Sequence, residues 1–408
     1  MRPLRVLYIH LTGAFGGSSR SLLETVRAFP DGAVQALFVT PRGTAGRFFS
    51  AVGEVIEAKG LTQFDNTRYS YYRGLRWLVL LREIAYLPAT VLALRRARQR
   101  WGAVDLIHLN EFTGLIPLWL ARRWFHAPPV VHVRSVARVA PGSWRTRWVN
   151  RMLSQEARAV IAIDETVRGS LPTQLSVDVV HNAFSPKDAA TPDGSLAVAL
   201  SALRPESFKV GFVGNLLRVK GIHELIEAAR LTRERGFDFE FIVVGDDAHS
   251  SRGWRARLLR LLGLEQNMRL EVETLLSRHS LRDRVHLVGF TSDIAQAYRR
   301  MDVLCFPSHY DAPGRPIFEA AFFRVPSIVA VRDPKPDTLI DGVTGIAIDP
   351  QSADQLARAL ERLATNREAS RRMGEAAYRM AVSNFDVHRN AADLLKVYRR
   401  IVDSTTNG

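Results

Sequence analysis

Two carboxylates eight positions apart, Asp311 and Glu319, flank the loop of this chain that is richest in potential chemistry. An apolar run at 303–306 precedes the loop and predicts a buried strand, and residues 317–323 have a helical pattern. A strand, a loop containing Gly314 and a helix start together expose backbone N–H groups, and the helix dipole favours an anion there. A carboxylate on each side can accept hydrogen bonds from sugar hydroxyls. The pattern therefore indicates a ligand with phosphates in the middle and a sugar at each end, as in a nucleotide-sugar.

A second loop, residues 214–221, lies between a predicted strand at 209–213 and a predicted helix at 222–235. A glycine at each end of the loop permits tight turning and a close approach of the backbone. Arg218 and Lys220 supply positive charge at the same strand end, which suits a diphosphate. Taken alone, the loop is equally well a turn with two solvated cations. With the carboxylate loop in the same half of the chain, we interpret both loops as one donor site.

The first half of the chain carries weaker signals. Gly16 and Gly17 follow a predicted strand, but they do not fit the dinucleotide fingerprint, and a plain turn explains them as well. Asn110, His132 and Arg134 lie at the ends of apolar runs, where an acceptor and a sugar could bind. A lone histidine is more often structural than catalytic. No histidine pair has zinc spacing, so no metal site is expected.

Short apolar runs alternate with helical patterns throughout, which predicts parallel sheets with helices on both faces. The predicted strands are at 6–9, 36–39, 106–109, 130–133 and 159–163, and then at 209–213, 239–244, 284–288, 303–306, 327–330 and 345–348. A length of 408 residues suits two domains. We expect an acceptor-binding domain at 1–185 and a nucleotide-sugar domain at 207–386, joined by a linker at 185–206 with three prolines. A helix at 387–403 is expected to return to the first domain.

Positive charge is concentrated at the start of the chain. Residues 1–190 hold 25 Lys or Arg against 13 Asp or Glu, and the remainder holds 31 against 28. The excess indicates an anionic partner, such as a membrane surface, a phosphorylated substrate or nucleic acid, or else solvated arginines that only aid solubility. Nucleic acid is not expected, because no recognition-helix or zinc-finger pattern accompanies the arginines.

Two segments, 68–88 and 144–148, mix aromatic, basic and aliphatic residues as membrane interfaces do, although the first also fits the core face of an ordinary helix. Charged residues and a proline interrupt the first segment, so it is not expected to span a bilayer. The single cysteine, Cys305, excludes an internal disulfide, and no secretory signal is seen. The expected location is the cytoplasm, with peripheral contact at the inner face of the cell membrane.

Over nearly its full length, and most strongly over 209–349, the chain resembles the retaining glycosyltransferases of family four, which have the GT-B fold. In that family two carboxylates separated by seven residues follow a Pro-Ser, and here Pro307 and Ser308 precede Asp311 and Glu319. The resemblance implies that Glu319 holds the ribose hydroxyls and that Asp311 contacts the donor sugar. Aspartate is one methylene shorter than the usual glutamate, so that contact or the preferred sugar is expected to differ.

The resemblance also covers the diphosphate loop. Lys220 matches the family lysine, whereas Asn215 stands where arginine is usual, and Arg218 could substitute for it by another route. Gly314 matches a glycine whose N–H meets the donor. The candidate catalytic residues are therefore Lys220, Arg218, Asp311 and Glu319, and the candidate donor contacts are Gly16, Gly17, Gly214, Asn215, Gly245, Gly314 and Arg315.

The resemblance implies an α/β protein with two Rossmann-like, doubly wound domains that face each other across a cleft. The implied reaction moves a sugar, with retention of configuration, from a UDP- or GDP-sugar to a hydroxyl of a glycan or lipid-linked acceptor in surface polysaccharide or glycolipid assembly. No cofactor is expected, and no Asp-x-Asp in a suitable loop indicates a metal. Two alternatives are a nucleotide-sugar epimerase or hydrolase on the same fold, and a catalytically silent partner subunit.

Overall fold

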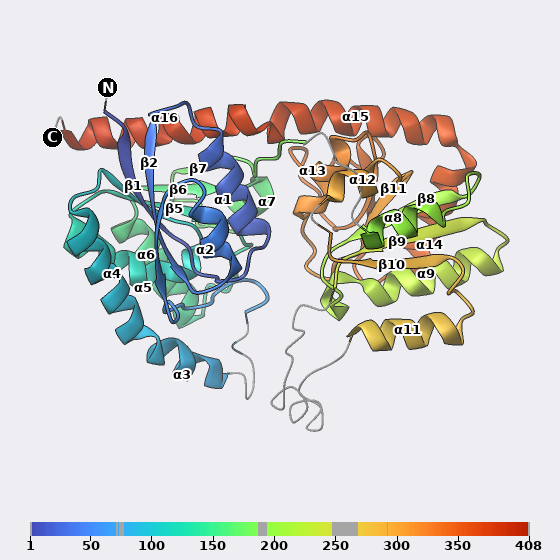
Figure 1. Ribbon diagram of the computed structural model, residues 1–408, viewed down its shortest axis with the longest axis horizontal. Coiled ribbons are helices and arrows are strands. Elements are labelled where there is room, and N and C mark those ends of the chain that lie inside the picture. The colour runs from blue at the N-terminus through green and yellow to red at the C-terminus, as the bar shows by residue number, and fades with distance from the viewer. Residues whose placement is uncertain are drawn as a thin grey trace. The chain divides into compact units, whose positions relative to one another are not determined.

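The computed structural model describes residues 2–70, 72, 77–186, 194–246, 268–291 and 293–406. The chain divides into two compact units. Unit 1 comprises Met1–Ser185 and Asn384–Gly408, and unit 2 comprises Pro186–Ser383. Each unit is built on its own parallel β-sheet (Figure 1).

Unit 1 alternates strands and helices along the chain. Its elements are β1 (Leu4–Ile9), α1 (Gly17–Arg27), β2 (Val34–Pro41), α2 (Thr44–Phe49), β3 (Glu54–Ala58), α3 (Leu78–Ala85), α4 (Leu87–Trp101), β4 (Leu106–Leu109), the short 3-10 helix η2 (Phe112–Gly114), α5 (Leu115–Phe125), β5 (Pro129–Val133), α6 (Trp144–Glu156), β6 (Ala159–Ala162), α7 (Glu165–Gly169), β7 (Val177–Val179) and α16 (Val387–Thr406). The seven strands are ordered β3-β2-β1-β4-β5-β6-β7.

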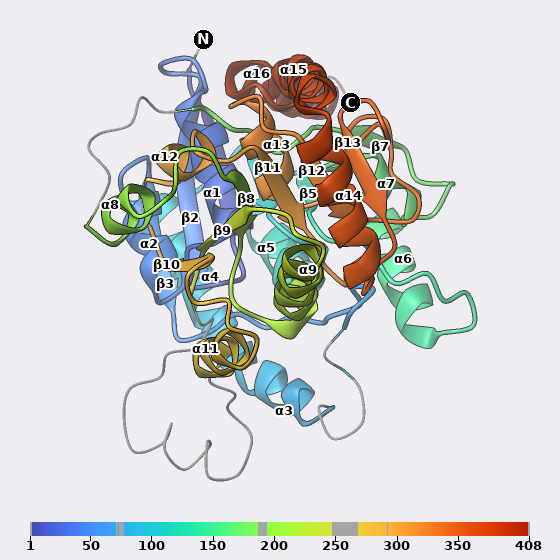
Figure 2. The same cartoon turned by 90° about the vertical axis from the view of Figure 1, so that its right-hand side faces the viewer.

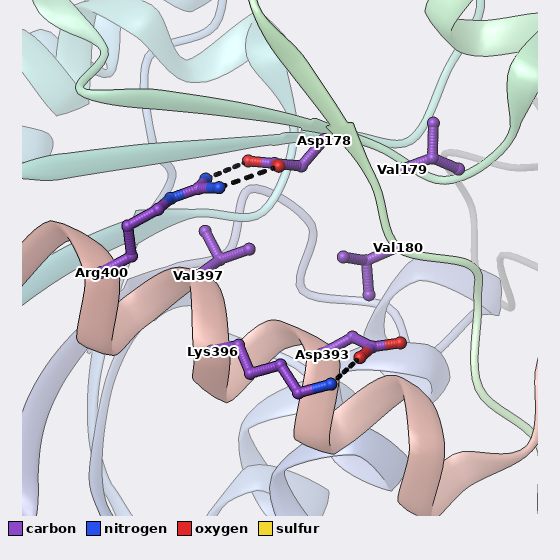
Figure 3. Close-up of a pocket in the computed structure, with 7 residues that line it drawn as sticks. All are labelled: Asp178, Val179, Val180, Asp393, Lys396, Val397 and Arg400. Atoms are coloured by element: carbon purple, nitrogen blue, oxygen red, sulfur yellow. Dashed lines mark hydrogen bonds and ion pairs between the residues drawn. The ribbon is translucent and has the colours of Figure 1, made fainter.

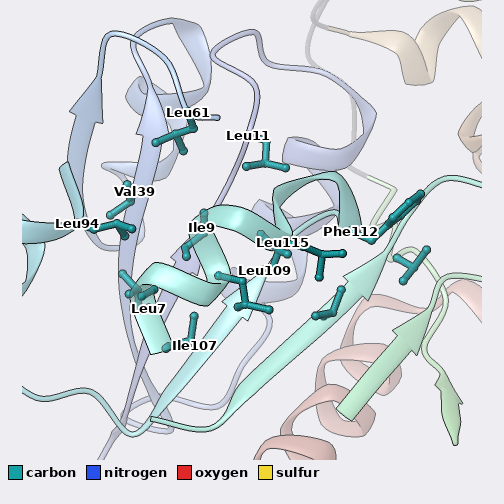
Figure 4. Close-up of a cluster of buried hydrophobic side chains, with 14 of the residues drawn as sticks. Leu7, Ile9, Leu11, Val39, Leu61, Leu94, Ile107, Leu109, Phe112 and Leu115 are labelled. Atoms are coloured by element: carbon teal, nitrogen blue, oxygen red, sulfur yellow. The ribbon is translucent and has the colours of Figure 1, made fainter. Parts of the chain in front are cut away.

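Both faces of this first sheet are buried, as fully apolar strands require. On one face, alternate strand residues such as Leu7, Ile9 and Ile107 pack against α4, α5 and α6 (Figure 4). On the other face, residues such as Tyr8 and Phe38 pack against α1, α2 and α16. The C-terminal helix α16 is thus part of the core of unit 1.

Unit 2 repeats the arrangement. Its elements are α8 (Gly194–Ser201), β8 (Phe208–Val213), the 3-10 helix η3 (Arg218–Lys220), α9 (Ile222–Glu234), β9 (Phe239–Val244), α11 (Met268–Arg278), β10 (Val285–Gly289), α12 (Ile294–Tyr298), β11 (Val303–Phe306), α13 (Arg315–Ala321), β12 (Ser327–Ala330), β13 (Gly345–Ile348), α14 (Ala353–Thr365) and α15 (Arg367–Phe385). Its six strands are ordered β10-β9-β8-β11-β12-β13. Helices α9, α11 and α14 cover one face, and α8, α12 and α13 cover the other (Figure 2).

The strand order reverses direction once in each sheet. The reversal lies between β1 and β4 in unit 1 and between β8 and β11 in unit 2. In open α/β sheets, loops diverge to opposite faces at this point and leave a crevice beyond the carboxyl ends of the strands, where ligands bind. In unit 2 the two loops singled out in the sequence, 214–221 and 307–314, follow these two strands.

The predicted α/β fold with two doubly wound sheets is confirmed. The sequence patterns missed the edge strands β3 and β7. Both are short and carry charged residues, Glu54 and Glu57 in β3 and Asp178 in β7, because an edge strand is only partly buried. The proposed linker at 185–206 contains α8, whose Leu196 is buried in the core of unit 2. Among the described residues, no helix is both long enough and apolar enough to cross a bilayer.

Candidate active site

The two loops at the reversal point of unit 2 are bonded to each other. The backbone N–H of His309 donates to the carbonyl of Val219 at 2.9 Å, and the Ser308 hydroxyl donates to the same oxygen at 3.3 Å. Gly221 has a φ of 81°, and a Cβ there would lie 2.0 Å from the Pro307 carbonyl oxygen. Only glycine allows this approach. The glycine at the end of loop 214–221 is therefore required for contact with loop 307–314.

Lys220 lies where these loops meet, and its surroundings are aromatic. Its Nζ is 4.8 Å from the centre of the Tyr310 ring and 5.6 Å from that of Phe306. No side chain among the described residues forms an ion pair or a hydrogen bond with this ammonium group. Burial lowers the pKa of Lys220, because desolvation disfavours the charged form. A ligand anion would supply the missing counter-charge.

Glu319, in contrast, is fully engaged. Its side chain is 4% exposed and accepts a hydrogen bond from Nε of Arg315, four residues earlier on α13. The Tyr298 hydroxyl at the end of α12 donates to its other oxygen at 2.9 Å. Arg315, predicted as a donor contact, is thus the ion-pair partner of Glu319. Tyr298 was not singled out in the sequence, because nothing in its local pattern indicates a partner 21 residues away.

Asp311 is held by Arg332, which lies just after β12. The backbone N–H of Arg332 donates to one carboxylate oxygen at 2.8 Å, and the Arg332 guanidinium contacts the other at 3.2 Å. Asp311 has a φ of 49°, in the left-handed region that aspartate tolerates better than most residues. Gly314, three residues on, has its backbone against the Phe306 ring, and a Cβ there would lie 2.4 Å from it. The loop is thus shaped by contacts at both ends.

The other candidate donor residues of unit 2 follow the ends of β8 and β9 or lie in the loop after β8. Gly245 has a φ of 140°, and a Cβ there would lie 1.9 Å from the carbonyl oxygen of Gly214, so the two backbones touch. Asn215 is exposed beside them. Arg218 forms an ion pair with Glu271 of α11, and Glu271 also contacts His223 at 2.9 Å. The structure therefore brings Gly214 and Gly245 together, whereas Arg218 is directed to a neighbouring helix.

In unit 1, polar side chains converge at the reversal point. Nε of Arg134 donates to Oδ1 of Asn110 at 2.6 Å, and another Arg134 nitrogen donates to Oδ1 of Asn182 at 2.7 Å. Nδ2 of Asn110 contacts Nδ1 of His10 at 2.9 Å. Sequence reasoning singled out Arg134 and Asn110 but missed His10 and Asn182. The position after the predicted strand at 6–9 was an available signal for His10, whereas Asn182 follows β7, which the sequence patterns missed.

His132, the third acceptor-side candidate, lies deeper in the sheet. It is 3% exposed, its ring packs edge-on against that of His108 at 5.4 Å, and an Arg134 nitrogen lies 3.4 Å from its Nδ1. The Tyr398 hydroxyl of α16 contacts Nδ1 of His108 at 2.7 Å. This geometry lets His132 orient Arg134 and keeps its own ring within the core.

The glycine loop of unit 1 is open. An added Cβ at Gly16 or Gly17 would meet nothing within 4 Å, so packing does not require glycine at either position. The N–H of Gly16 donates to the Ser19 hydroxyl at 2.7 Å. Nearby, Glu111 accepts hydrogen bonds from the Ser135 hydroxyl and from the backbone of Phe112. Burial raises the pKa of Glu111 to about 7.

Three buried histidines and Glu111 should make the stability of unit 1 depend on pH. Burial, with Arg134 nearby, lowers the pKa of His10 to about 3, and burial lowers the pKa values of His108 and His132 well below 6.5. Below pH 6.5 the unfolded chain therefore binds three protons that the native state excludes. Between pH 4.5 and 6.5 the raised pKa of Glu111 returns one proton to the native state. With a net difference of two protons, the free energy of unfolding should fall by roughly 2–3 kcal/mol per pH unit.

Urea denaturation at pH 7.5, 6 and 5 would measure this slope. Six of the seven tryptophans precede residue 185, so their emission reports on unit 1. A midpoint that stays constant over this pH range would contradict the prediction.

A hollow of about 410 Å³ between β7 and α16 has a different character (Figure 3). Its charged side chains pair with each other, Arg400 with Asp178 and Lys396 with Asp393 at 2.8 Å. Because these charges already balance each other, they leave no free charge to attract a ligand. The loops of unit 2 are therefore the better candidate site. No group of three or more His, Cys, Asp or Glu within the described residues could hold a metal ion.

Comparison with known families agrees with this division of the chain. Residues 16–184 match the family model described as a glycosyl transferase 4-like domain, and residues 200–380 match the model of glycosyl transferases group 1. The chain is 26% identical over 264 residues to an alpha-D-kanosaminyltransferase of Streptomyces kanamyceticus, covering 62% of this chain and 64% of that one. It is 27% identical over 327 residues to a D-inositol 3-phosphate glycosyltransferase of an Arthrobacter strain, covering 76% and 73%.

Solved structures share the fold. HepE of Anabaena, in complex with UDP-glucose, aligns with a TM-score of 0.72 at 21% identity over 97% of this chain and 100% of that chain. Sucrose-phosphate synthase of Thermosynechococcus elongatus aligns with a TM-score of 0.73 at 20% identity over 98% and 100%. The chain belongs to the GT4-type glycosyltransferases and has the GT-B fold.

Proposed function

We propose that this enzyme is a retaining glycosyltransferase that uses a UDP- or GDP-sugar as donor and binds it in unit 2. The observation that carries the proposal is the environment of Lys220. A partly buried ammonium group faces two aromatic rings and has no carboxylate partner in the described part of the chain, beside a glycine loop at the reversal point of the sheet. This is the arrangement expected for a cation that awaits a diphosphate. HepE, which has the same fold, was solved in complex with UDP-glucose, and this supports the assignment.

The proposed reaction breaks the bond between the anomeric carbon of the sugar and the diphosphate oxygen. Negative charge develops on the leaving diphosphate, and Lys220 stabilises it more strongly in the transition state than in the ground state. The acceptor hydroxyl attacks the same face of the sugar, and its proton passes to the departing phosphate oxygen. The configuration at the anomeric carbon is therefore kept. Glu319 is assigned to the ribose hydroxyls and Asp311 to the donor sugar, as the resemblance implies.

Unit 1 is assigned to the acceptor. The Arg134–Asn110–His10 network presents polar groups at the strand ends, and the basic character of the first half of the chain suits an anionic or lipid-linked acceptor. We assign Gly16, Gly17, Gly214, Asn215, Gly245 and Gly314 to backbone contacts with the ligands. The reaction is assigned to surface polysaccharide or glycolipid assembly at the inner face of the membrane, and it needs no metal.

A thermal-shift screen of nucleotide-sugars tests the donor assignment. A donor that binds the native state at about 100 times its Kd should raise the melting temperature of the protein by several degrees, because binding stabilises only the folded form. The shift should persist in EDTA, as should sugar transfer with an acceptor. No shift with any UDP- or GDP-sugar would refute donor binding, and transfer abolished by EDTA but restored by Mg²⁺ would refute metal independence.

The same assay separates the alternatives. An epimerase or hydrolase would convert the nucleotide-sugar without any acceptor present. A silent partner subunit would show neither conversion nor transfer, even if it bound the nucleotide. The proposed transferase requires product that appears only when an acceptor is supplied, with the anomeric configuration of the donor retained by NMR.

A further inference from the structure

Helix α3 turns an apolar face to solvent. Leu78, Leu81 and Ile84 are 64%, 62% and 56% exposed, and Glu83 is the buried residue of this helix. A helix on the surface of a soluble unit normally has the opposite pattern, with its apolar stripe facing the core. Three large aliphatic side chains at steps of three residues therefore form one exposed stripe.

Exposed apolar residues continue into the next helix. Tyr86 ends α3 and precedes α4 with helical backbone angles, φ −81° and ψ −10°. Beyond it Leu87 and Leu92 are also exposed, at 38% and 52%. The helical spacing then reaches Arg95 and Gln99 one and two turns further on. Exposed apolar residues are thus followed by exposed arginines along the chain. Figure 1 shows α3 and α4 as consecutive helices.

The basic end has arginines without acidic partners. Arg95, Arg98 and Gln99 of α4, with Trp124 of α5, line a hollow of about 260 Å³. Arg95, Arg96 and Arg98 are exposed, and none of them forms an ion pair with any residue that the structure describes. Such a cluster is repulsive by itself, so an external anion would stabilise it.

Exposed tryptophans join the apolar end. Trp77 immediately precedes α3 and is 39% exposed, and Trp144 at the start of α6 is 56% exposed. Although 67 positions apart, they are linked by ring contacts: Trp77 stacks on Tyr72 at 5.1 Å, Tyr72 contacts Phe64 at 5.7 Å, and Phe64 contacts Trp144 at 5.6 Å. The two aromatic and basic segments of the sequence thus pack together.

We propose that this surface docks unit 1 onto an anionic phospholipid bilayer. The docking surface consists of Leu78, Leu81, Ile84, Leu87 and Leu92, the flanking Trp77 and Trp144, and the cluster of Arg95, Arg96 and Arg98. The aliphatic face enters the interface between headgroups and acyl chains, the indoles lie at headgroup level, and the arginines bind lipid phosphates. The inference names the membrane partner of the proposed function, and it does not depend on the donor chemistry.

The chemistry favours a bilayer over a protein partner or nucleic acid. A nucleic acid would use the arginines but not the exposed leucines. A protein groove that receives one amphipathic helix would use the leucines, and it would have no need of an arginine cluster a few turns further along. A negatively charged bilayer uses both at once, because its phosphates and its acyl chains are adjacent.

Flotation of the full-length protein with vesicles tests the proposal. We expect binding to vesicles of phosphatidylcholine with 30% phosphatidylglycerol, weak binding to pure phosphatidylcholine, and a loss with added salt. Leu81→Ser with Ile84→Ser, and separately Arg95→Glu with Arg98→Glu, should each reduce binding at least about tenfold. The substituted side chains are exposed, so the melting temperature should hardly change. Matched controls are Val198→Ser on α8 and Arg371→Glu on α15, both exposed and in unit 2.

A fluorescent label locates the insertion. Cys305 is the single cysteine and is buried, so Leu81→Cys accepts an environment-sensitive thiol label selectively. Its emission should shift to the blue with phosphatidylglycerol vesicles, whereas a label at Val198→Cys should not respond. The proposal fails if the protein does not bind vesicles, if the paired variants bind like the parent, or if the label at position 81 stays in water. If the protein bound DNA as well as it binds vesicles, and the label at position 81 showed no blue shift, the partner would be a polyanion and not a membrane.

Discussion

Replacing Lys220 by methionine is expected to lower kcat/KM for sugar transfer by about 10²–10³-fold, the usual effect of removing one preorganised group that stabilises developing negative charge. Binding of UDP or GDP should weaken by a smaller factor, because the diphosphate in the ground state carries less concentrated charge than the leaving group. The measurement is steady-state transfer together with calorimetric titration of the nucleotide.

The expected effect on stability has the opposite sign. Burial lowers the pKa of Lys220, so the folded protein bears a desolvation cost for keeping this group charged. Methionine keeps most of the side-chain length and can contact the rings of Phe306 and Tyr310 through its sulfur. The melting temperature should therefore stay the same or rise while activity falls. If Lys220 had only a structural role, the substitution would lower the melting temperature and leave activity unchanged.

Lys209 provides a control on the same strand. It lies at the amino end of β8, where its Nζ donates to the carbonyl oxygens of Pro205 and Ser207. Lys209→Met removes one positive charge from the same unit but should leave kcat/KM within about twofold of the parent. Equal loss in both variants would mean that net charge alone matters, and full activity of Lys220→Met would remove the basis of the proposed site.

The fold could be predicted in detail because its determinants are local. Apolar runs such as 303–306 are buried on both faces of a parallel sheet, and periodicity alone identifies them. Glycine positions were equally informative, since Gly221 and Gly245 are required by backbone contacts that no other residue allows. The edge strands of unit 1, β3 and β7, were missed because they are only partly buried and their patterns are weak.

Partners across the fold could not be predicted. The sequence indicated Arg218 as a phosphate contact, but Glu271, 53 positions away, pairs with it. Likewise Arg332 holds Asp311, and Asn182 holds Arg134, through pairings that depend on the order of the strands in each sheet. Spacing therefore indicated candidate residues, and the sheet order determined which of them meet.

Replacing Glu319 is expected to cause the second large loss of activity. Two causes must be separated, the loss of stability and the loss of a contact with the ribose. Glu319→Ala leaves Arg315, whose side chain is only 11% exposed, without its carboxylate, and leaves the Tyr298 hydroxyl without its acceptor. Breaking a buried ion pair by removing one partner costs about 3–5 kcal/mol, so this variant should be strongly destabilised. Its loss of activity would then say little about the ribose, because much of the protein would be unfolded or distorted.

A double variant resolves this ambiguity. In Arg315→Met with Glu319→Met both charges are replaced by apolar groups, and such replacements are often neutral or stabilising. We expect the free energy of unfolding to recover most of the loss seen in Glu319→Ala, as a double-mutant cycle from urea denaturation would measure. If Glu319 also holds the ribose hydroxyls, the stable double variant should still bind UDP or GDP about 10–100-fold more weakly than the parent. A 2′,3′-dideoxy nucleotide should bind parent and double variant alike. Parental affinity for the ordinary nucleotide in the double variant would restrict Glu319 to its pairing with Arg315 and Tyr298.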